Sequence, residues 1–69
     1  MYIIYGKTRC NYCANAVKLL QDRGLSFEYR SMDDRAEELV SLFTIYNWKT
    51  VPLVIETTET DNNFIGGYD

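Results

Sequence analysis

Cys10 and Cys13 are the only cysteines in the chain, and they lie three residues apart where an apolar run gives way to a helix-like pattern. If a helix begins at Cys10, its sulfur occupies the N-cap, facing the unpaired backbone N–H groups of the first turn and the positive end of the helix dipole. A thiolate accepts such hydrogen bonds, and Lys7 and Arg9 add positive charge nearby. We therefore expect a lowered pKa for Cys10 and a less exposed, less nucleophilic Cys13 one turn inward.

Other uses of this cysteine pair fit the sequence less well. The chain has no histidine and no third cysteine, so it cannot supply the four ligands of a structural zinc site from these residue types. A structural disulfide that closes so short a loop would constrain the unfolded chain little. The spacing and the strand-to-helix context favour a redox-active dithiol, and we expect no metal site.

Length and composition limit the remaining possibilities. The 69 residues allow one domain, spanning 1–69, and a hydrophobic fraction of 46% is typical of a globular chain. The net charge of −3 argues against nucleic acid as a partner. The first residues lack the basic region and cleavage site of a signal peptide, and no apolar run approaches the length of a membrane span. We therefore expect no membrane partner and a cytoplasmic location, which suits working thiols.

The first half of the chain predicts a strand–helix–strand unit. Residues 2–5 are β-branched and aromatic, as in a buried strand, and Gly6 ends the run. Over residues 10–23 the apolar positions recur at helical spacing, and Gly24 supplies a C-terminal stop. Residues 25–32 contain an alternating strand pattern. Two strands joined in this way should pair in parallel, with a right-handed crossover.

A second amphipathic helix is predicted to follow. Asp34 and Glu37 have the spacing of an N-cap and its capping-box partner. The apolar side of this helix should consist of Ala36, Leu39, Val40 and Phe43. The helix should continue to about Tyr46, with Asn47 as a left-handed stop. We expect Trp48 to pack at the end of this helix.

The last third of the chain predicts a β-hairpin. Residues 51–55 form a third strand, with Pro52 at its start because proline cannot donate to a ladder. Residues 57–62 are polar and should turn, and residues 63–65 form a short returning strand. The predicted element order is β-α-β-α-β-β, in the α/β class.

This order, with a cysteine pair at the head of the first helix, resembles the glutaredoxin branch of the thioredoxin-fold family, which has a four-stranded mixed sheet with flanking helices. Three motifs carry the resemblance along the whole chain: residues 7–13 (KTRCNYC), Thr50-Val51-Pro52, and Gly66-Gly67-Tyr68-Asp69. Their order and spacing together are specific. The small size, and asparagine after Cys10 where many members have proline, are similar to small bacterial or viral glutaredoxins.

The resemblance implies a role for each motif. Cys10 matches the nucleophile that attacks a disulfide, and Cys13 matches the resolving thiol. Glutathione would be a cosubstrate, and no tightly bound cofactor is implied. The implied glutathione-binding positions are Lys7, Tyr12, Lys49, Thr50, Val51, Pro52, Gly66, Gly67, Tyr68 and Asp69. In the family the proline is cis and the residue before it pairs with the peptide, while the glycine turn and its carboxylate hold the γ-glutamyl end and the lysines attract the glycyl carboxylate.

The implied function is a thiol–disulfide oxidoreductase that reduces glutathione mixed disulfides and protein disulfides, with ribonucleotide reductase as a client suggested by the resemblance alone. Two alternatives stay open. Some small relatives are recharged by thioredoxin reductase and do not bind glutathione. Others are binding modules in which two chains and two glutathiones share an iron–sulfur cluster through the first cysteine. The motif at residues 66–69 favours glutathione.

Glutaredoxins usually continue beyond the glycine pair with a further helix, whereas this sequence stops at Asp69. In the family that helix lies beside the first helix on one face of the sheet. Without it, the sides of Val17 and Leu20 would face water. We therefore expect either a longer natural protein, or a partner or second copy that covers this face; the protein would then be a monomer or a dimer.

Overall fold

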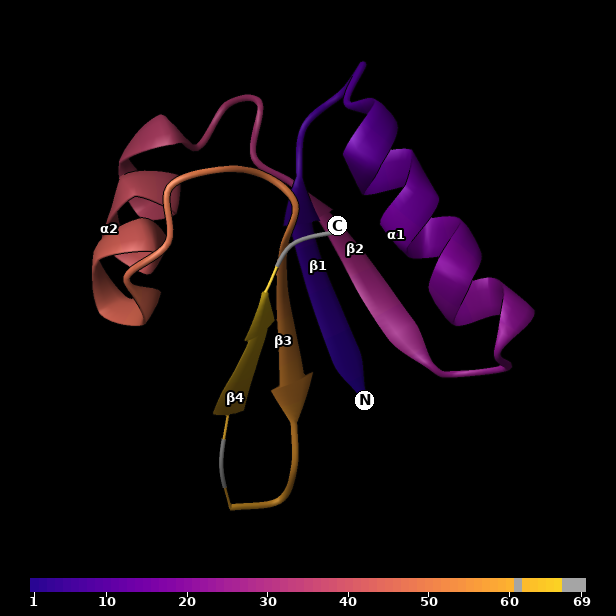
Figure 1. The fold of residues 1–69 in the computed structure, drawn as a ribbon. Helices are drawn as coiled ribbons and strands as arrows, with labels where there is room; N and C mark the ends of the chain where they lie inside the picture. Colours follow the sequence, from indigo (N-terminus) through magenta and orange to yellow (C-terminus); the bar gives the residue numbers. More distant parts are fainter. Residues whose placement is uncertain (61, 67–69) are drawn as a thin grey trace.

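The computed structural model describes residues 1–60 and 62–66, which form two helices and four strands (Figure 1). The elements are β1 (Tyr2–Gly6), α1 (Asn11–Asp22), β2 (Phe27–Ser31), α2 (Ala36–Tyr46), β3 (Leu53–Thr57) and β4 (Asn62–Gly66). This confirms the predicted order β-α-β-α-β-β. Neither helix of the described residues is long and apolar enough to cross a membrane.

The four strands form one mixed sheet in the order β2-β1-β3-β4. β1 pairs with β2 in parallel, as the strand–helix–strand unit predicts, while the β1–β3 and β3–β4 pairs are antiparallel. Tyr5, near the end of β1, lies opposite Leu53, the first residue of β3. The loop that follows β1 and the segment that precedes β3 therefore meet at the same end of the sheet.

The two helices cover opposite faces of the sheet (Figure 1). Successive strand residues point to opposite faces, so Ile4 and Tyr5 belong to different cores. One buried cluster lies under α1 and consists of Ile4, Ala16, Leu20 and Val54. The other lies under α2 and consists of Tyr5, Met32, Leu39, Leu53 and Ile55. Contrary to the expectation for the α1 side, Leu20 is buried and Val17 is half-buried, because both pack on the α1-side cluster.

The start and stop of α1 are those that the sequence predicts. Cys10 is the N-cap residue, with an extended backbone, and its side chain accepts a hydrogen bond from the first turn. At the other end Gly24 has φ of +66°, the left-handed conformation that suits glycine after a helix. The backbone N–H of Gly24 donates to the carbonyl of Gln21 at 3.0 Å.

The predicted capping box of α2 is wrong. The N-cap residue is Arg35, which makes no side-chain capping hydrogen bond, and the helix starts at Ala36. A turn closed by the N–H of Arg35 and the carbonyl of Met32, 3.1 Å apart, delays the helix by one residue. Asp34 and Glu37 are therefore out of register for reciprocal capping, although Glu37 still lies in the first turn, where a carboxylate suits the helix dipole.

The apolar side of α2 also differs from the prediction. Val40 is 60% exposed and Ala36 is exposed. The residues that face the sheet are Leu39, Leu42, Phe43 and Tyr46, a set with regular helical spacing that leaves Val40 about 100° around the helix. The left-handed stop at Asn47, with φ of +53°, is confirmed.

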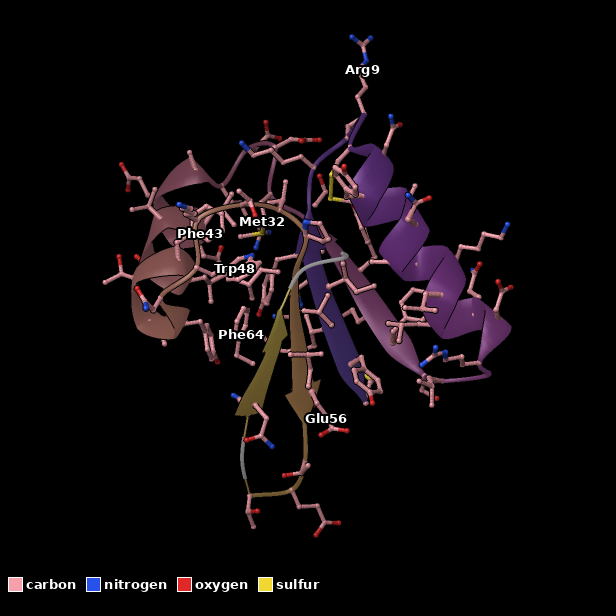
Figure 2. The ribbon with its side chains drawn as sticks, viewed as in Figure 1. Arg9, Met32, Phe43, Trp48, Glu56 and Phe64 are labelled. Atoms are coloured by element: carbon pink, nitrogen blue, oxygen red, sulfur yellow. A yellow bond between two sulfur atoms is a disulfide. The ribbon has the colours of Figure 1, made fainter. Side chains whose placement is uncertain are left out.

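The hairpin is confirmed, with shifted boundaries. β3 begins at Leu53, after Pro52, because proline has no N–H for the ladder, and it continues to Thr57. β4 is one residue longer at each end than the predicted strand over residues 63–65. Trp48 packs as expected: its ring centroid is 5.1 Å from that of Phe64, between α2 and the sheet (Figure 2).

Candidate active site

The two cysteines form a disulfide across the first turn of α1, with Cα atoms 5.2 Å apart. The yellow bond in Figure 2 lies where the loop after β1 enters the helix. Cys13 is 1% exposed, whereas Cys10 is half-buried. The predicted difference in exposure is therefore confirmed.

The Cys10 sulfur lies at the positive end of α1. The backbone N–H of Cys13 donates to Cys10 Sγ at 3.1 Å. Arg9 adopts φ of +63° and its guanidinium points away from the disulfide (Figure 2), contrary to the expectation that it supplies positive charge there. The helix terminus therefore directs an N–H donor and the positive end of its dipole at the Cys10 sulfur.

The loop before Cys10 is held by a carboxylate that the sequence analysis missed. Asp33, just beyond β2, accepts a hydrogen bond from the backbone N–H of Thr8 at 3.0 Å and another from the Thr8 hydroxyl. The hydroxyl of Ser31 also donates to Asp33, at 3.0 Å. These hydrogen bonds, with a smaller contribution from the charge of Lys7, lower the pKa of Asp33. In the sequence, 25 residues separate Asp33 from Thr8, and no local pattern connects them.

Gly6 lies against the buried cysteine. A Cβ atom at Gly6 would lie 2.9 Å from the sulfur of Cys13 and 2.5 Å from the hydroxyl oxygen of Tyr29, closer than side chains approach one another. The same hydroxyl donates to the backbone carbonyl of Lys7 at 3.2 Å. The sequence pattern indicated Gly6 only as a strand end; its close approach to the Cys13 sulfur is a second reason for glycine there.

A cavity of about 320 Å³ lies at the same end of the sheet. Its lining residues are Lys7, Leu39, Phe43, Lys49, Thr50 and Val51. Four of them, Lys7 in the loop after β1 and residues 49–51 before β3, are positions that the family resemblance implied for ligand binding. The antiparallel pairing of β1 with β3 brings these distant segments together.

The other implied ligand positions are placed as follows. The Val51–Pro52 peptide bond is cis, as the resemblance implied, and Pro52 is buried. Tyr12 is 61% exposed, beside Cys13 on the first turn of α1. Gly66 is buried at the end of β4, with φ of +124°. Gly67, Tyr68 and Asp69 lie outside the described residues. Across residues 1–60 and 62–66, no group of three or more His, Cys, Asp or Glu side chains is arranged to hold a metal ion.

The family of the chain follows from its similarity to known proteins. Residues 2–58 match the model of the glutaredoxin family. The chain belongs to the glutaredoxin family. No curated protein matches it. The matched region contains the cysteine pair and the cis-proline segment, and it ends before the motif at residues 66–69.

This glutaredoxin is a thiol–disulfide oxidoreductase. With the roles that the resemblance implies for the two cysteines, a Cys10 thiolate would attack one sulfur of a substrate disulfide, that bond would break, and one product would leave as a thiolate with the electron pair. Cys13, buried and within disulfide distance, would then attack the Cys10 sulfur and expel the second product thiolate. This half of the cycle would end in the Cys10–Cys13 disulfide.

Proposed function

We propose that this glutaredoxin takes its electrons from glutathione and reduces protein disulfides and glutathione mixed disulfides. The observation that carries the proposal is the cavity that places Lys7 and Lys49 together at the active-site end of the sheet. The chain as a whole has a net charge of −3, yet two lysines line this one cavity. This local positive charge favours an anionic ligand.

The charge of glutathione suits the two lysines of this cavity. It is a tripeptide with two carboxylates and one amino group, so it carries a net negative charge. Val51 lines the cavity and lies before the first paired residue of β3, so we expect its backbone to pair with an extended peptide there.

Glutathione would close the catalytic cycle without a metal or an organic cofactor. One glutathione thiolate attacks Cys10 of the disulfide and releases Cys13; a second attacks the glutathione sulfur and releases Cys10. The products are the reduced enzyme and glutathione disulfide, so the two electrons balance. Ribonucleotide reductase as a client and a cytoplasmic location stay predictions of the family resemblance.

The electron source is tested by reducing the purified oxidised protein in two parallel assays. One contains glutathione, glutathione reductase and NADPH, and the other contains thioredoxin reductase and NADPH. We expect rapid reduction in the first and slow reduction in the second. Reduction by thioredoxin reductase alone would overturn the proposal and identify a thioredoxin-reductase-dependent redoxin.

The cavity is tested by Lys7→Ala and Lys49→Ala. Each should raise the KM for glutathione about two- to fivefold and leave kcat nearly unchanged, because an exposed ion pair contributes about 0.2–1 kcal/mol and acts on ground state and transition state alike. Lys18→Ala, an exposed lysine of α1, is the matched control and should change neither constant. Unchanged glutathione kinetics in both cavity variants would place the ligand elsewhere.

A further inference from the structure

We propose that Tyr29 is a positioning residue for the resolving step, whose hydroxyl donates a hydrogen bond to the sulfur of Cys13 whenever that sulfur carries negative charge. This inference rests on thiol–disulfide exchange, which family membership establishes, and not on the use of glutathione. It assigns a role to a β2 side chain that the sequence motifs do not include.

The first support is geometric. The hydroxyl oxygen of Tyr29 and the sulfur of Cys13 approach the same point above Gly6, to 2.5 and 2.9 Å. Because Gly6 has no side chain, no Gly6 atom fills the space that the Tyr29 hydroxyl and the Cys13 sulfur both approach. The strand register explains the approach: Tyr29 lies opposite Ile4, on the face of the sheet that α1 covers, and Gly6 follows two residues later on that face.

The second support is that the hydroxyl has one proton and two possible acceptors. In the disulfide form it donates to the Lys7 carbonyl at 3.2 Å, and a disulfide sulfur is only a weak acceptor. A thiolate at Cys13 is a charged acceptor, and hydrogen bonds to charged groups are about twice as strong as neutral ones. In the reduced form the hydroxyl would turn from the Lys7 carbonyl to the charged sulfur, which needs a shift of the Tyr29 side chain as well as rotation about its C–O bond, because the disulfide form has the hydroxyl bonded to Lys7.

The third support is that Cys13 needs such a donor. Its side chain is 1% exposed, and burial disfavours a charged sulfur. Its own backbone N–H is already directed at Cys10. Partial burial and the negative charge of Asp33 raise the pKa of Tyr29, so the hydroxyl keeps its proton and acts as a donor, not as a base.

The hydrogen bond would act in both directions of the exchange. When a thiolate attacks Cys10 of the disulfide, the S–S bond breaks and Cys13 leaves with the electron pair; the Tyr29 hydroxyl stabilises that charge until solvent supplies a proton. In the opposite direction, Cys13 loses its proton to solvent, attacks the mixed disulfide at Cys10 and expels the substrate thiolate. In both cases Tyr29 keeps its own proton.

The test uses Tyr29→Phe and the chromogenic disulfide 5,5′-dithiobis(2-nitrobenzoate). Attack by Cys10 releases one thionitrobenzoate, and closure by Cys13 releases the second, so stopped-flow absorbance reads the two steps separately. Loss of a hydrogen bond to a charged group lowers the thiolate population roughly tenfold. Without the hydrogen bond each Cys13 thiolate is also more basic and therefore more nucleophilic, which offsets part of this loss. Below the pKa of Cys13, formation of the Cys10–Cys13 disulfide should therefore slow about threefold, with the first phase unchanged.

Tyr2→Phe is the matched control, since Tyr2 belongs to the same face at the far end of β1 from the cysteines, and both phases should keep the wild-type rates. Fluorescence of Trp48, the only tryptophan, checks that each variant is folded. An unchanged second phase in Tyr29→Phe would overturn the proposal. Equal slowing of both phases would also overturn it, because the hydroxyl would then act by holding the loop at Lys7.

Discussion

The two cysteines share one helical turn and yet have opposite environments. Cys10 caps α1 at the surface, with an N–H directed at its sulfur, whereas Cys13 lies beneath it against Gly6. A nucleophile must meet its substrate and a resolving thiol must not compete for it. This asymmetry therefore supports the roles that the sequence motif implied for the two residues.

The asymmetry predicts selective alkylation of the reduced protein. A short pulse of iodoacetamide at pH 6 should modify Cys10 much faster than Cys13, because the helix N-terminus stabilises the Cys10 thiolate and burial disfavours a charge on Cys13. Mass spectrometry of the digested protein measures the ratio. Equal modification of the two cysteines would contradict the assignment.

Gly6 predicts a second effect at the same site. Gly6→Ala places a methyl group against the Cys13 sulfur, and overpacking of this kind costs roughly 1–3 kcal/mol. The free energy of unfolding should fall by this amount, measured by urea titration, and closure of the disulfide should slow.

Gly24→Ala is the matched control for that variant. Among the described residues, beyond the chain neighbours of Gly24, no atom lies within 4 Å of an added Cβ there, but φ of +66° disfavours alanine. It should therefore destabilise the protein by about 1 kcal/mol without changing thiol chemistry. If the Cys10–Cys13 disulfide formed at the wild-type rate in Gly6→Ala, Cys13 would accommodate the added methyl group.

At the scale of elements, the end of β2 holds the loop that leads to Cys10. Asp33 binds both the backbone and the side chain of Thr8, and Tyr29 binds the next carbonyl, that of Lys7. β2 is an edge strand with mostly exposed residues, so its contribution to the core is small. Its contribution to the active site is through these polar contacts.

The lowered pKa of Asp33 predicts the pH range in which this contact stabilises the protein. The folded state binds the Asp33 proton less tightly than the unfolded state, so the stabilisation is complete above the unfolded pKa of about 4 and disappears as the pH falls through the lower, folded value. The stability difference between wild type and Asp33→Ala should be constant above about pH 5 and shrink below pH 4.

Asp34→Ala is the matched control, since Asp34 is a neighbouring exposed carboxylate that does not take part in the hydrogen bonds of Thr8. Its stability difference from wild type should not share the acid dependence of Asp33→Ala. Urea titrations across this pH range measure both differences. A difference for Asp33→Ala that persists unchanged to pH 2 would mean that the carboxylate charge contributes nothing to the loop.

At the scale of the whole molecule, the central strands β1 and β3 combine stability with function. They hold the buried centres of both faces, and at their shared end the cysteine pair follows β1 and the cis-proline segment precedes β3. A change in the register of this strand pair would therefore disturb the core and the active site together.

Leu53 tests how far the molecule depends on that centre. It is fully buried on β3, so Leu53→Ala should lower the free energy of unfolding by about 2–5 kcal/mol, comparable to the whole stability of a domain this small. Leu19→Ala, at a helix position 38% exposed, should cost less than about 1 kcal/mol. Unfolding is monitored by Trp48 fluorescence. Similar losses in the free energy of unfolding in the two variants would contradict the burial pattern.

The sequence by itself determined the features that depend on neighbouring residues. The element order, Cys10 as N-cap, the left-handed stop at Asn47 and the hairpin are confirmed, because caps, turns and periodicity involve residues within about one helical turn or one strand. The predicted capping box of α2 is wrong although its spacing was suitable, because a turn tied to the end of β2 shifted the helix start.

Only the tertiary structure decided which distant residues meet. The contact of Asp33 with Thr8, the approach of Tyr29 and Cys13 to Gly6, and the shared cavity of Lys7 and Lys49 each join segments that are separate in the chain. Such contacts depend on strand order and register, since a shift of one residue turns every side chain of a strand to the other face. Local composition does not encode that register, because it is set by how the whole sheet packs between α1 and α2.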